Sequence, residues 1–279
     1  MKLITWNIQW GLGVDGRLDL ARLIDDAKSI ADFDVLCLQE VSDNFAGLQA
    51  NGGENQFAEI AALLPGYTAI EGVALDVPDG NGGRRRFGNM ILSRLPVAQV
   101  LRHTLPWEAD STRNMPRLLL EAVVNAPFGP VRVMTTHLEY SSDKIRRAQV
   151  EGIREAHRMA CDRVALPREN GPGTYARFPT ARSAVLTGDF NMKPHDPTKL
   201  RLSDAYDNGV PALMDAWQVL NGADAHPPSF CLYDQTNGQP HCCDFVFVTE
   251  DLAPRASRIV YNQDIQSSDH QPVLLELTR

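Results

Sequence analysis

The chain has 279 residues, of which 43% are hydrophobic and 22% are charged, a composition typical of a globular protein with a core of its own. No run approaches the roughly 18 apolar residues that a membrane span requires, which excludes such a span, and the apolar stretch after Lys2 is too short for a signal peptide. The net charge of −8, without a lysine-rich tail, argues against tight non-specific binding to a nucleic-acid backbone.

The five cysteines are odd in number and lack the spacing of a disulfide framework. Reduced thiols are therefore expected, and with them a cytoplasmic protein. Cys231, His241, Cys242 and Cys243 invite comparison with a zinc cluster. We do not expect one, because neighbouring cysteines rarely ligate the same tetrahedral ion and no C-x-x-C spacing is present.

Hydrophobic periodicity and turn residues divide the chain into strands and helices without a linker, which predicts one domain over residues 1–279. The predicted strands cover 2–8, 34–38, two short segments within 67–75, 88–93, 98–104, 116–124, 131–136, 182–187, 244–248, 255–261 and 272–277. The predicted helices follow Asp19, cover 54–64, start at Ser142 and lie near 212–220. Strands 88–93 and 98–104 are expected to pair with each other, as are 116–124 and 131–136.

A flexible, triply basic loop is expected over residues 80–86. Its arginines, Arg84 to Arg86, suit either a phosphate clamp or a solvated tip. The Gly- and Pro-rich segment 167–180 is a second expected loop, and residues 194–241 are expected to be mostly loops.

The most informative stretch is the strand over 182–187 that ends at Gly188 and delivers Asp189 and Asn191. The two side chains are two residues apart, so they leave an extended backbone on the same face. Together they offer three acceptor oxygens and one amide donor, which a phosphate ester, a divalent cation and an attacking water require at close range. The alternative is a solvated turn capped by these side chains.

Other polar side chains share this position at the end of an apolar strand. They are Asn7, Glu40, His137, Asp189 and Asn191, with Asp269 and His270 next to a further strand. Strand ends of a sheet gather on one rim, so we expect these residues to form a single site.

The motifs that contain these residues occur in one order along the chain. They are Thr5-Trp-Asn-Ile8, Leu38-Gln-Glu-Val41, Gly88 to Ser93, Thr136-His-Leu138, Leu186 to Asn191, Asp244-Phe-Val-Phe247 and Ser268-Asp-His270. This pattern resembles the endonuclease/exonuclease/phosphatase superfamily of divalent-metal phosphoesterases. The resemblance implies an α/β fold, a four-layer sandwich of two mixed β-sheets packed face to face with helices outside.

The Thr-His-Leu form resembles the deoxyribonuclease, sphingomyelinase and inositol-phosphatase branches. The abasic-site endonucleases carry a tyrosine at the position of His137 and an acid at that of Gln9, so the resemblance argues against abasic-site repair.

Phosphodiester hydrolysis needs charge neutralised on the phosphoryl oxygens, an aligned water and a protonated leaving group. Glu40 is the expected hard ligand for Mg²⁺ (or Mn²⁺), and Asn7 would complete the metal's protein shell. Asp189 would orient and deprotonate the water, and Asn191 would donate to a phosphoryl oxygen. Either Asp189 or a neutral His270 suits the role of general base.

His137 and His270 are both expected to flank the phosphate in their protonated form. Asp269 adjoins His270, and the resemblance implies that Asp244 reaches His137; such carboxylates favour a charged imidazole. Arg113 and Arg117 are both candidates for binding the phosphate, with a slight preference for Arg113.

The sequence thus predicts a metal-dependent phosphoester hydrolase, with a phosphodiester preferred over a monoester. Its substrate would be a nucleic acid or a small or lipid-linked phosphodiester, and no obligate protein partner is evident. Trp107, Tyr140 and Tyr233 are candidates for stacking on a flat group, or for packing. The rival hypothesis, a binding protein on a catalytically dead scaffold, is disfavoured because the acidic and histidine residues are intact.

Overall fold

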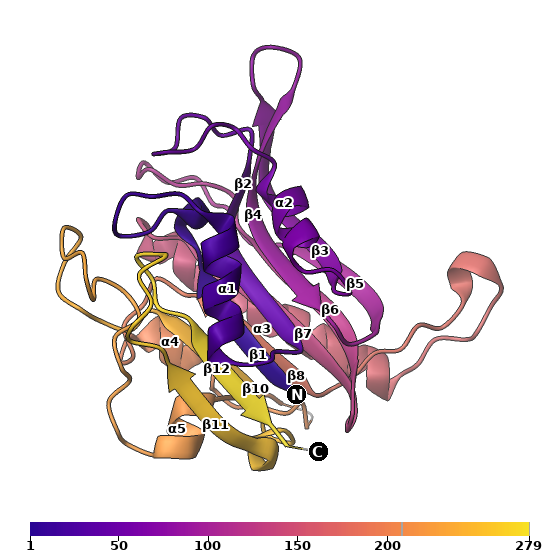
Figure 1. Ribbon diagram of the computed structural model, residues 1–279. Coiled ribbons are helices and arrows are strands. Elements are labelled where there is room, and N and C mark those ends of the chain that lie inside the picture. Colours follow the sequence, from indigo (N-terminus) through magenta and orange to yellow (C-terminus); the bar gives the residue numbers. More distant parts are fainter. Residues whose placement is uncertain (208, 279) are drawn as a thin grey trace.

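In the computed structural model, which describes residues 1–207 and 209–278, two six-stranded sheets pack face to face with helices on their outer faces (Figure 1). Both sheets contain parallel and antiparallel neighbours, so the predicted four-layer α/β sandwich is confirmed. Positions 208 and 279 of the predicted domain lie outside the described residues.

The first sheet carries both ends of the chain. Its strands, in spatial order, are β11 (Ala256–Tyr261), β12 (Val273–Leu277), β1 (Lys2–Asn7), β2 (Val35–Asp43), β4 (Arg84–Ser93) and β3 (Thr68–Pro78). β1 and β2 are parallel, and their register places Asn7 beside Gln39. Asn7 and Glu40 therefore emerge at one edge of this sheet.

The second sheet contains the most polar strand ends. Its strands, in spatial order, are β5 (Val97–Thr104), β6 (Leu118–Ala126), β7 (Gly129–His137), β8 (Ala184–Asp189), β10 (Asp244–Thr249) and β9 (Leu213–Asp215). β7 and β8 are parallel with His137 opposite Asp189, and β10 runs antiparallel with Asp244 opposite Asp189. Three ionisable residues thus stand side by side at the end of this sheet.

The helices lie outside the sheets, and most of them bury an apolar face there. They are α1 (Leu20–Ile30), α2 (Gln56–Leu63), α3 (Asp143–Ala165), α4 (Pro197–Arg201) and α5 (Ala216–Asn221), with 3₁₀ turns at Gln9–Gly11, Gly173–Tyr175 and Ala253–Arg255. The predicted caps are present: the side chains of Asp19 and Ser142 accept from the backbone of Arg22 and Ile145. α1 and α2 cover the first sheet, and α3 covers the second (Figure 1).

Three predicted details of the strands are wrong. Two short strands were expected over 67–75, but this segment belongs to one strand, β3. Its pairing with β4 shifts register between Val73 and Leu75, and the strand continues past this irregularity. Arg84 to Arg86 lie in β4 rather than in a loop. β4 does not pair with the strand that follows it, since β4 lies between β2 and β3 while β5 pairs with β6 in the other sheet.

A buried polar cluster joins α3 to the second sheet far from the polar strand ends. The guanidinium of Arg132, which has no exposed surface, donates to Nδ1 of His157, and Nε2 of His157 lies 2.9 Å from the carbonyl oxygen of Pro211. Burial, with the nearby charge of Arg132, lowers the pKa of His157 from 6.5 to about 4. The folded protein therefore holds this imidazole neutral.

The stability of the protein is expected to fall between pH 6.5 and pH 4, because the unfolded chain takes up a proton at His157 that the folded chain refuses. The loss from this group is about 3 kcal/mol at pH 4. In His157→Gln, which cannot titrate, this part of the pH dependence should be absent. Urea unfolding of both proteins at several pH values measures the difference, and identical slopes would contradict the assignment.

Candidate active site

Asp189 occupies the centre of the polar rim, as the last residue of β8. The strand can approach β7 this closely because residue 188 is glycine: a Cβ there would lie 1.9 Å from the carbonyl oxygen of Thr136, and the backbone φ is 141°. Glycine is therefore required sterically at the position before Asp189. Glycine allows the two strands to present His137 and Asp189 next to each other.

The carboxylate of Asp189 is the acceptor for much of the site. Nδ2 of Asn7 donates to its Oδ2 at 3.0 Å, and the backbone N–H of Asn191 donates to its Oδ1 at 2.9 Å. Nε2 of His137 lies 3.4 Å from Oδ2, and Nε2 of His270 lies 3.8 Å from it. Burial opposes ionisation, but the charge of His270 and these hydrogen bonds prevail and lower the pKa of Asp189.

His270 is held by Asp244, not by Asp269. Its Nδ1 lies 2.8 Å from Oδ2 of Asp244, which also accepts a 2.7 Å hydrogen bond from Oγ of Ser229. The ring of Phe230 stacks on the imidazole, with centroids 4.4 Å apart. Burial opposes the charged imidazole, but Asp244 and Asp189 raise the pKa of His270 well above its usual value.

The expectation that Asp244 reaches His137 is therefore wrong. The antiparallel register of β8 and β10 puts Asp244 on the opposite side of Asp189 from His137, within reach of His270. The carboxylate of Asp269 instead accepts from Oγ of Ser268 at 3.4 Å.

His137 differs in protonation from His270. Burial, reinforced by the charge of Arg117, lowers the pKa of His137 to about 3, so this imidazole is neutral near pH 7. In the structure only His270 carries the extra proton that was expected of both histidines. Its Nδ1 lies 3.9 Å from Oε1 of Glu40, so the neutral ring sits between Glu40 and Asp189.

Glu40 and Asp269, called the acidic pair below, lie near enough for the negative charge of Asp269 to act on Glu40. Burial and the negative charge of Asp269 raise the pKa of Glu40 to about 7, and burial also raises that of Asp269. Glu40 has a left-handed backbone, with φ of 62°, where the pairing of β2 and β4 shifts register. Such a backbone is costly for a non-glycine residue and is typical of functional sites. Nδ2 of Asn7 lies 3.3 Å from Oε1 of Glu40 and links the acidic pair to Asp189.

The two candidate arginines occupy different surroundings. Arg117 is 8% exposed, its Nε has no hydrogen-bond partner, and it lines a small recess with Asn89 and His137. Its nearest carboxylate is that of Glu139, with Nε and Oε2 3.8 Å apart. Arg113 lies exposed in the loop before β6. The structure thus brings Arg117, and not the preferred Arg113, next to the histidine.

Asn191 and the arginine cluster of β4 have partners of their own. Nδ2 of Asn191 is the group expected to donate to a phosphoryl oxygen. In the structure it donates a 3.0 Å hydrogen bond to the carbonyl oxygen of Leu138. Arg84 pairs with Asp76 at 2.7 Å, and Arg86 pairs with Asp43 and Glu71 at 2.7 and 2.9 Å. These acids pair with both ends of the triply basic segment, so it is not a free phosphate clamp. Arg84 lies exposed at the tip of the hairpin between β3 and β4, which agrees with the solvated alternative.

Sequence reasoning missed Ser229, Phe230 and Glu139. Ser229 and Phe230 lie in a segment without periodicity, so no sequence signal indicates that they contact Asp244 and His270. Glu139 follows His137 by two residues and could have been noticed as one more acid at a strand end.

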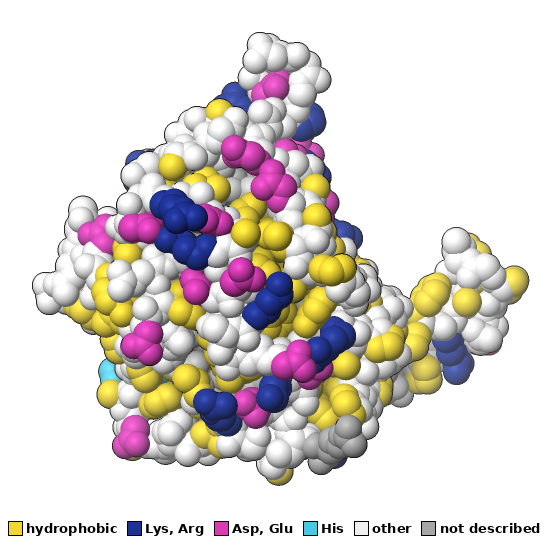
Figure 2. All heavy atoms as spheres, viewed as in Figure 1, with side chains coloured by type: hydrophobic (Ala, Val, Ile, Leu, Met, Phe, Trp, Pro, Cys, Tyr) yellow, Lys and Arg dark blue, Asp and Glu magenta, His cyan; other side chains and the backbone are white. Residues whose placement is uncertain are grey.

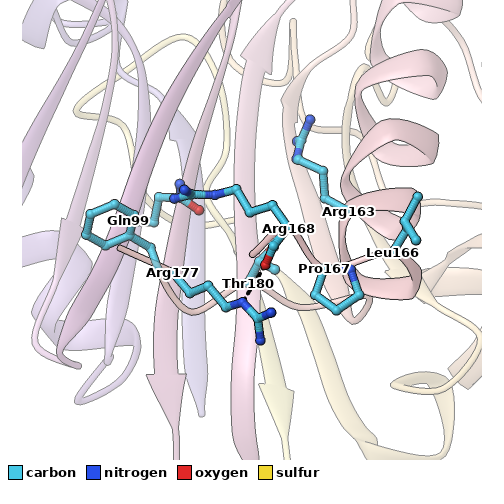
Figure 3. Close-up of a pocket in the computed structure, with 8 residues that line it drawn as sticks. Gln99, Arg163, Leu166, Pro167, Arg168, Arg177 and Thr180 are labelled. Carbon is cyan, nitrogen blue, oxygen red and sulfur yellow. Dashed lines mark hydrogen bonds between the residues drawn. The ribbon is translucent and has the colours of Figure 1, made fainter. Parts of the chain in front are cut away.

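A surface pocket lies outside the polar rim that contains Asp189. It is lined by Gln99, Arg163, Arg168 and Arg177 among others (Figure 3). These residues come from β5, from the end of α3 and from the loop before β8. The loop leads into the first residue of β8, whereas Asp189 is the last residue of that strand. None of the candidate catalytic residues lines this pocket.

Within the described part of the chain, the helices are too short or too polar to cross a membrane.

Comparisons with known proteins agree with this geometry. A model of the endonuclease/exonuclease/phosphatase family matches residues 4–270, whereas a search of curated proteins finds no match. Among solved structures, an endonuclease/exonuclease/phosphatase from Beutenbergia cavernae is similar, with 24% identity, a TM-score of 0.68 and coverage of 99% of this chain and 71% of that chain. A mannosyl-6-phosphatase of Bacteroides thetaiotaomicron follows, with 17% identity, a TM-score of 0.66 and complete coverage of both chains. The human Nocturnin catalytic domain, with bound sulfate, has 15% identity, a TM-score of 0.64 and coverage of 100% and 93%.

Proposed function

Because the chain belongs to the endonuclease/exonuclease/phosphatase family, we propose that it is a divalent-metal-dependent phosphoester hydrolase acting on a phosphodiester. The observation that carries the proposal is the arrangement around Asp189. An ionised carboxylate lies 3.4 Å from one imidazole and 3.8 Å from another, beside an acidic pair. Attack on a phosphoester needs a base, donors for the phosphoryl oxygens and a cation in one place.

The donor set suits Mg²⁺ (or Mn²⁺), which prefers carboxylate and amide oxygens. Glu40 and Asp269 would hold the ion. Burial raises the pKa of both carboxyl groups, and the charge of a divalent cation would offset this effect and favour their ionised form. Asn7 is the third candidate; its Nδ2 faces the carboxylates and its Oδ1 accepts from the backbone of Gln9, so direct ligation requires its amide to turn over. When bound, the ion supplies charge neutralisation at the phosphoryl oxygens.

Asp189 is the proposed general base for in-line attack of water on phosphorus. Its lowered pKa keeps it ionised, and its hydrogen bonds from Asn7 and Asn191 fix its position. His270, charged and held by Asp244, would stabilise negative charge on the phosphoryl oxygens. Its raised pKa supports Asp189 over a neutral His270 as the base. His137 would act as a neutral donor, and Arg117 would supply positive charge next to it.

The surface supports a compact substrate as the alternative to a long nucleic acid. Basic and acidic side chains are interspersed on the face seen in Figure 2, with no continuous basic tract there. The carboxylates around Arg84 and Arg86 remove the basic segment that the sequence offered. A small-molecule or lipid-headgroup phosphoester therefore stays a second candidate, and the fold likeness to a mannosyl-6-phosphatase agrees with it. Exposed Trp107, Tyr140 and Tyr233 would suit either substrate by stacking on a flat group.

The cellular setting proposed is the cytoplasm. All five cysteines are free and buried in the structure, which suits a reducing compartment. One catalytic domain over residues 1–279, without an obligate protein partner, is part of the same proposal.

The metal requirement is tested with EDTA. Hydrolysis of a chromogenic phosphodiester should vanish in EDTA and return with Mg²⁺ or Mn²⁺, because the charges of His270 and Arg117 do not equal that of a divalent cation at the phosphoryl oxygens. Glu40→Gln should require a higher Mg²⁺ concentration for half-maximal activity, by roughly tenfold or more. Glu59→Gln, an exposed change on α2, is the matched control and should behave as the wild type. Full activity in the chelator would end the proposal.

The substrate class is tested by comparing kcat/KM for plasmid DNA, short RNA and a small diester at two salt concentrations. Each phosphate contact on duplex DNA costs about 0.9 log units of affinity per tenfold increase in salt. We expect a shallow dependence, because most of the charge of Arg84 and Arg86 is already paired. Efficient plasmid cleavage with a slope of about six or more contacts would instead establish a DNA-tracking nuclease.

A further inference from the structure

Cys243 brings a thiol into the candidate active site. It lies immediately before β10, is 2% exposed, and its Sγ lies 3.9 Å from Nδ1 of His270 and 3.5 Å from Oδ2 of Asp244. The reaction proposed above uses the carboxylate and imidazole of these two neighbours but has no role for a thiol. The presence of a thiol next to Asp244 and His270 is therefore not explained by the proposed hydrolysis.

The thiol completes a group with metal-ligand spacing. One ligand atom each from Asp189, Cys243 and His270 lie within 4.8 Å of one another, and this is the one such group among the residues that the structure describes. Tetrahedral zinc keeps its ligand atoms about 3.3–3.8 Å apart, so small side-chain shifts would close the group around an ion.

Asp244 adds buried negative charge beside this group, since its Oδ2 lies 3.5 Å from Sγ of Cys243 and 2.8 Å from Nδ1 of His270. The residue is 1% exposed, and its Oδ1 has no hydrogen-bond partner although Oδ2 has several. An unpaired carboxylate oxygen in so buried a position is costly unless another group compensates it. A cation bound to the group would offset the buried negative charge of Asp244.

Sulfur determines which cation the group would select. Mg²⁺ and Ca²⁺ take oxygen ligands, whereas Zn²⁺, Co²⁺ and Cd²⁺ accept thiolate together with imidazole and carboxylate. The group is thus chemically distinct from the acidic pair of Glu40 and Asp269.

We propose that Asp189, Cys243 and His270 form an inhibitory site for a thiophilic divalent cation such as Zn²⁺. As the metal binds, the Cys243 thiol and the charged His270 imidazole each release one proton to solvent, and the imidazole and the Asp189 carboxylate needed for hydrolysis become metal ligands. The inhibitory part rests on the proposed hydrolase function, but the binding part does not.

Co²⁺ titration tests the binding part without any substrate, because a thiolate ligand gives cobalt a near-ultraviolet charge-transfer band that oxygen ligands do not. We expect the band in the wild type and its loss in Cys243→Ser. The matched control is Cys242→Ser: Cys242 is equally buried, but its Sγ faces the carbonyl oxygen of Asp244 and the hydroxyl of Tyr261, at 3.3 and 3.8 Å. This variant should keep the band.

The inhibitory part is tested with Zn²⁺ in excess Mg²⁺, each protein being compared with its own activity in Mg²⁺ alone. Cys243→Ser should raise the Zn²⁺ concentration for half-inhibition by at least about tenfold, whereas Cys242→Ser should not. Cys243→Ala serves if the serine variant unfolds.

A wild type without a thiolate–cobalt band, or a band that survives in Cys243→Ser, overturns the site. A band without Zn²⁺ inhibition overturns the inhibitory role. If no phosphoester is hydrolysed, the proposed function fails while the cobalt titration still decides whether the site exists.

Discussion

Asp189→Asn is expected to lower kcat by roughly 10³-fold at saturating Mg²⁺, the largest loss for a change of one atom in this chain. Asparagine keeps the size of the side chain, but its one oxygen can accept from only one of the two donors, because Nδ2 of Asn7 donates to Oδ2 and the N–H of Asn191 to Oδ1. It cannot take a proton from water, and it removes the negative charge between His137 and His270. Steady-state turnover of a small phosphodiester measures the loss, with a thermal melt of the same sample to show that the fold is intact.

Asp196→Asn is the matched control for this change. Asp196 caps α4 through a 2.7 Å hydrogen bond from the backbone of Thr198. Asparagine caps helices about as well as aspartate, so stability and kcat should both stay near wild type. An Asp189→Asn protein that retained a tenth or more of the activity would remove Asp189 from the role of base.

The catalytic rim could be predicted because its residues occupy strand ends. Asn7, Glu40, His137 and Asp189 each follow an apolar run, and an apolar run is visible in sequence as the inside of a sheet. Since β1 and β2 are parallel, as are β7 and β8, the ends of these strands fall on one edge. The resemblance of the motifs added the fold, which periodicity alone does not give.

The partners of these residues could not be predicted, because they depend on the order of the strands. Nothing in the sequence around Asp244 indicates that β10 pairs antiparallel with β8, and this pairing is what places Asp244 beside His270 instead of His137. The false pairing of β4 with β5 has the same origin, since alternation reveals a strand but not its neighbour. The carboxylates that neutralise Arg84 and Arg86 also come from adjoining strands.

Protonation states could not be predicted either. His137 and His270 each end or adjoin an apolar strand, and their motifs suggest the same role. Burial near Arg117 makes His137 neutral, whereas a carboxylate contact at 2.8 Å charges His270. These are effects of tertiary structure, and they separate two residues that look equivalent in sequence.

The two histidines are accordingly expected to respond unequally to glutamine. Glutamine keeps an N–H donor but carries no charge, so His270→Gln should lower kcat by roughly 10³-fold with little change in KM. His137→Gln replaces one neutral donor by another and should cost about tenfold. Asp244→Asn should cost roughly 10²-fold, because it leaves the imidazole in place but removes the carboxylate that favours its charged form.

The ratio of the two glutamine variants carries the argument, since both changes are equally conservative in size and both sites are buried at 7% and 6% exposure. A general loss of packing would lower both activities together, whereas a difference in charge lowers only one of them strongly. Alanine removes the donor at either position, and at His270 the charge as well, so His137→Ala and His270→Ala should both lose roughly 10²- to 10⁴-fold and cannot separate the roles. Equal losses in the glutamine pair would mean that both imidazoles act as cations once substrate and metal are bound, as their motifs suggest.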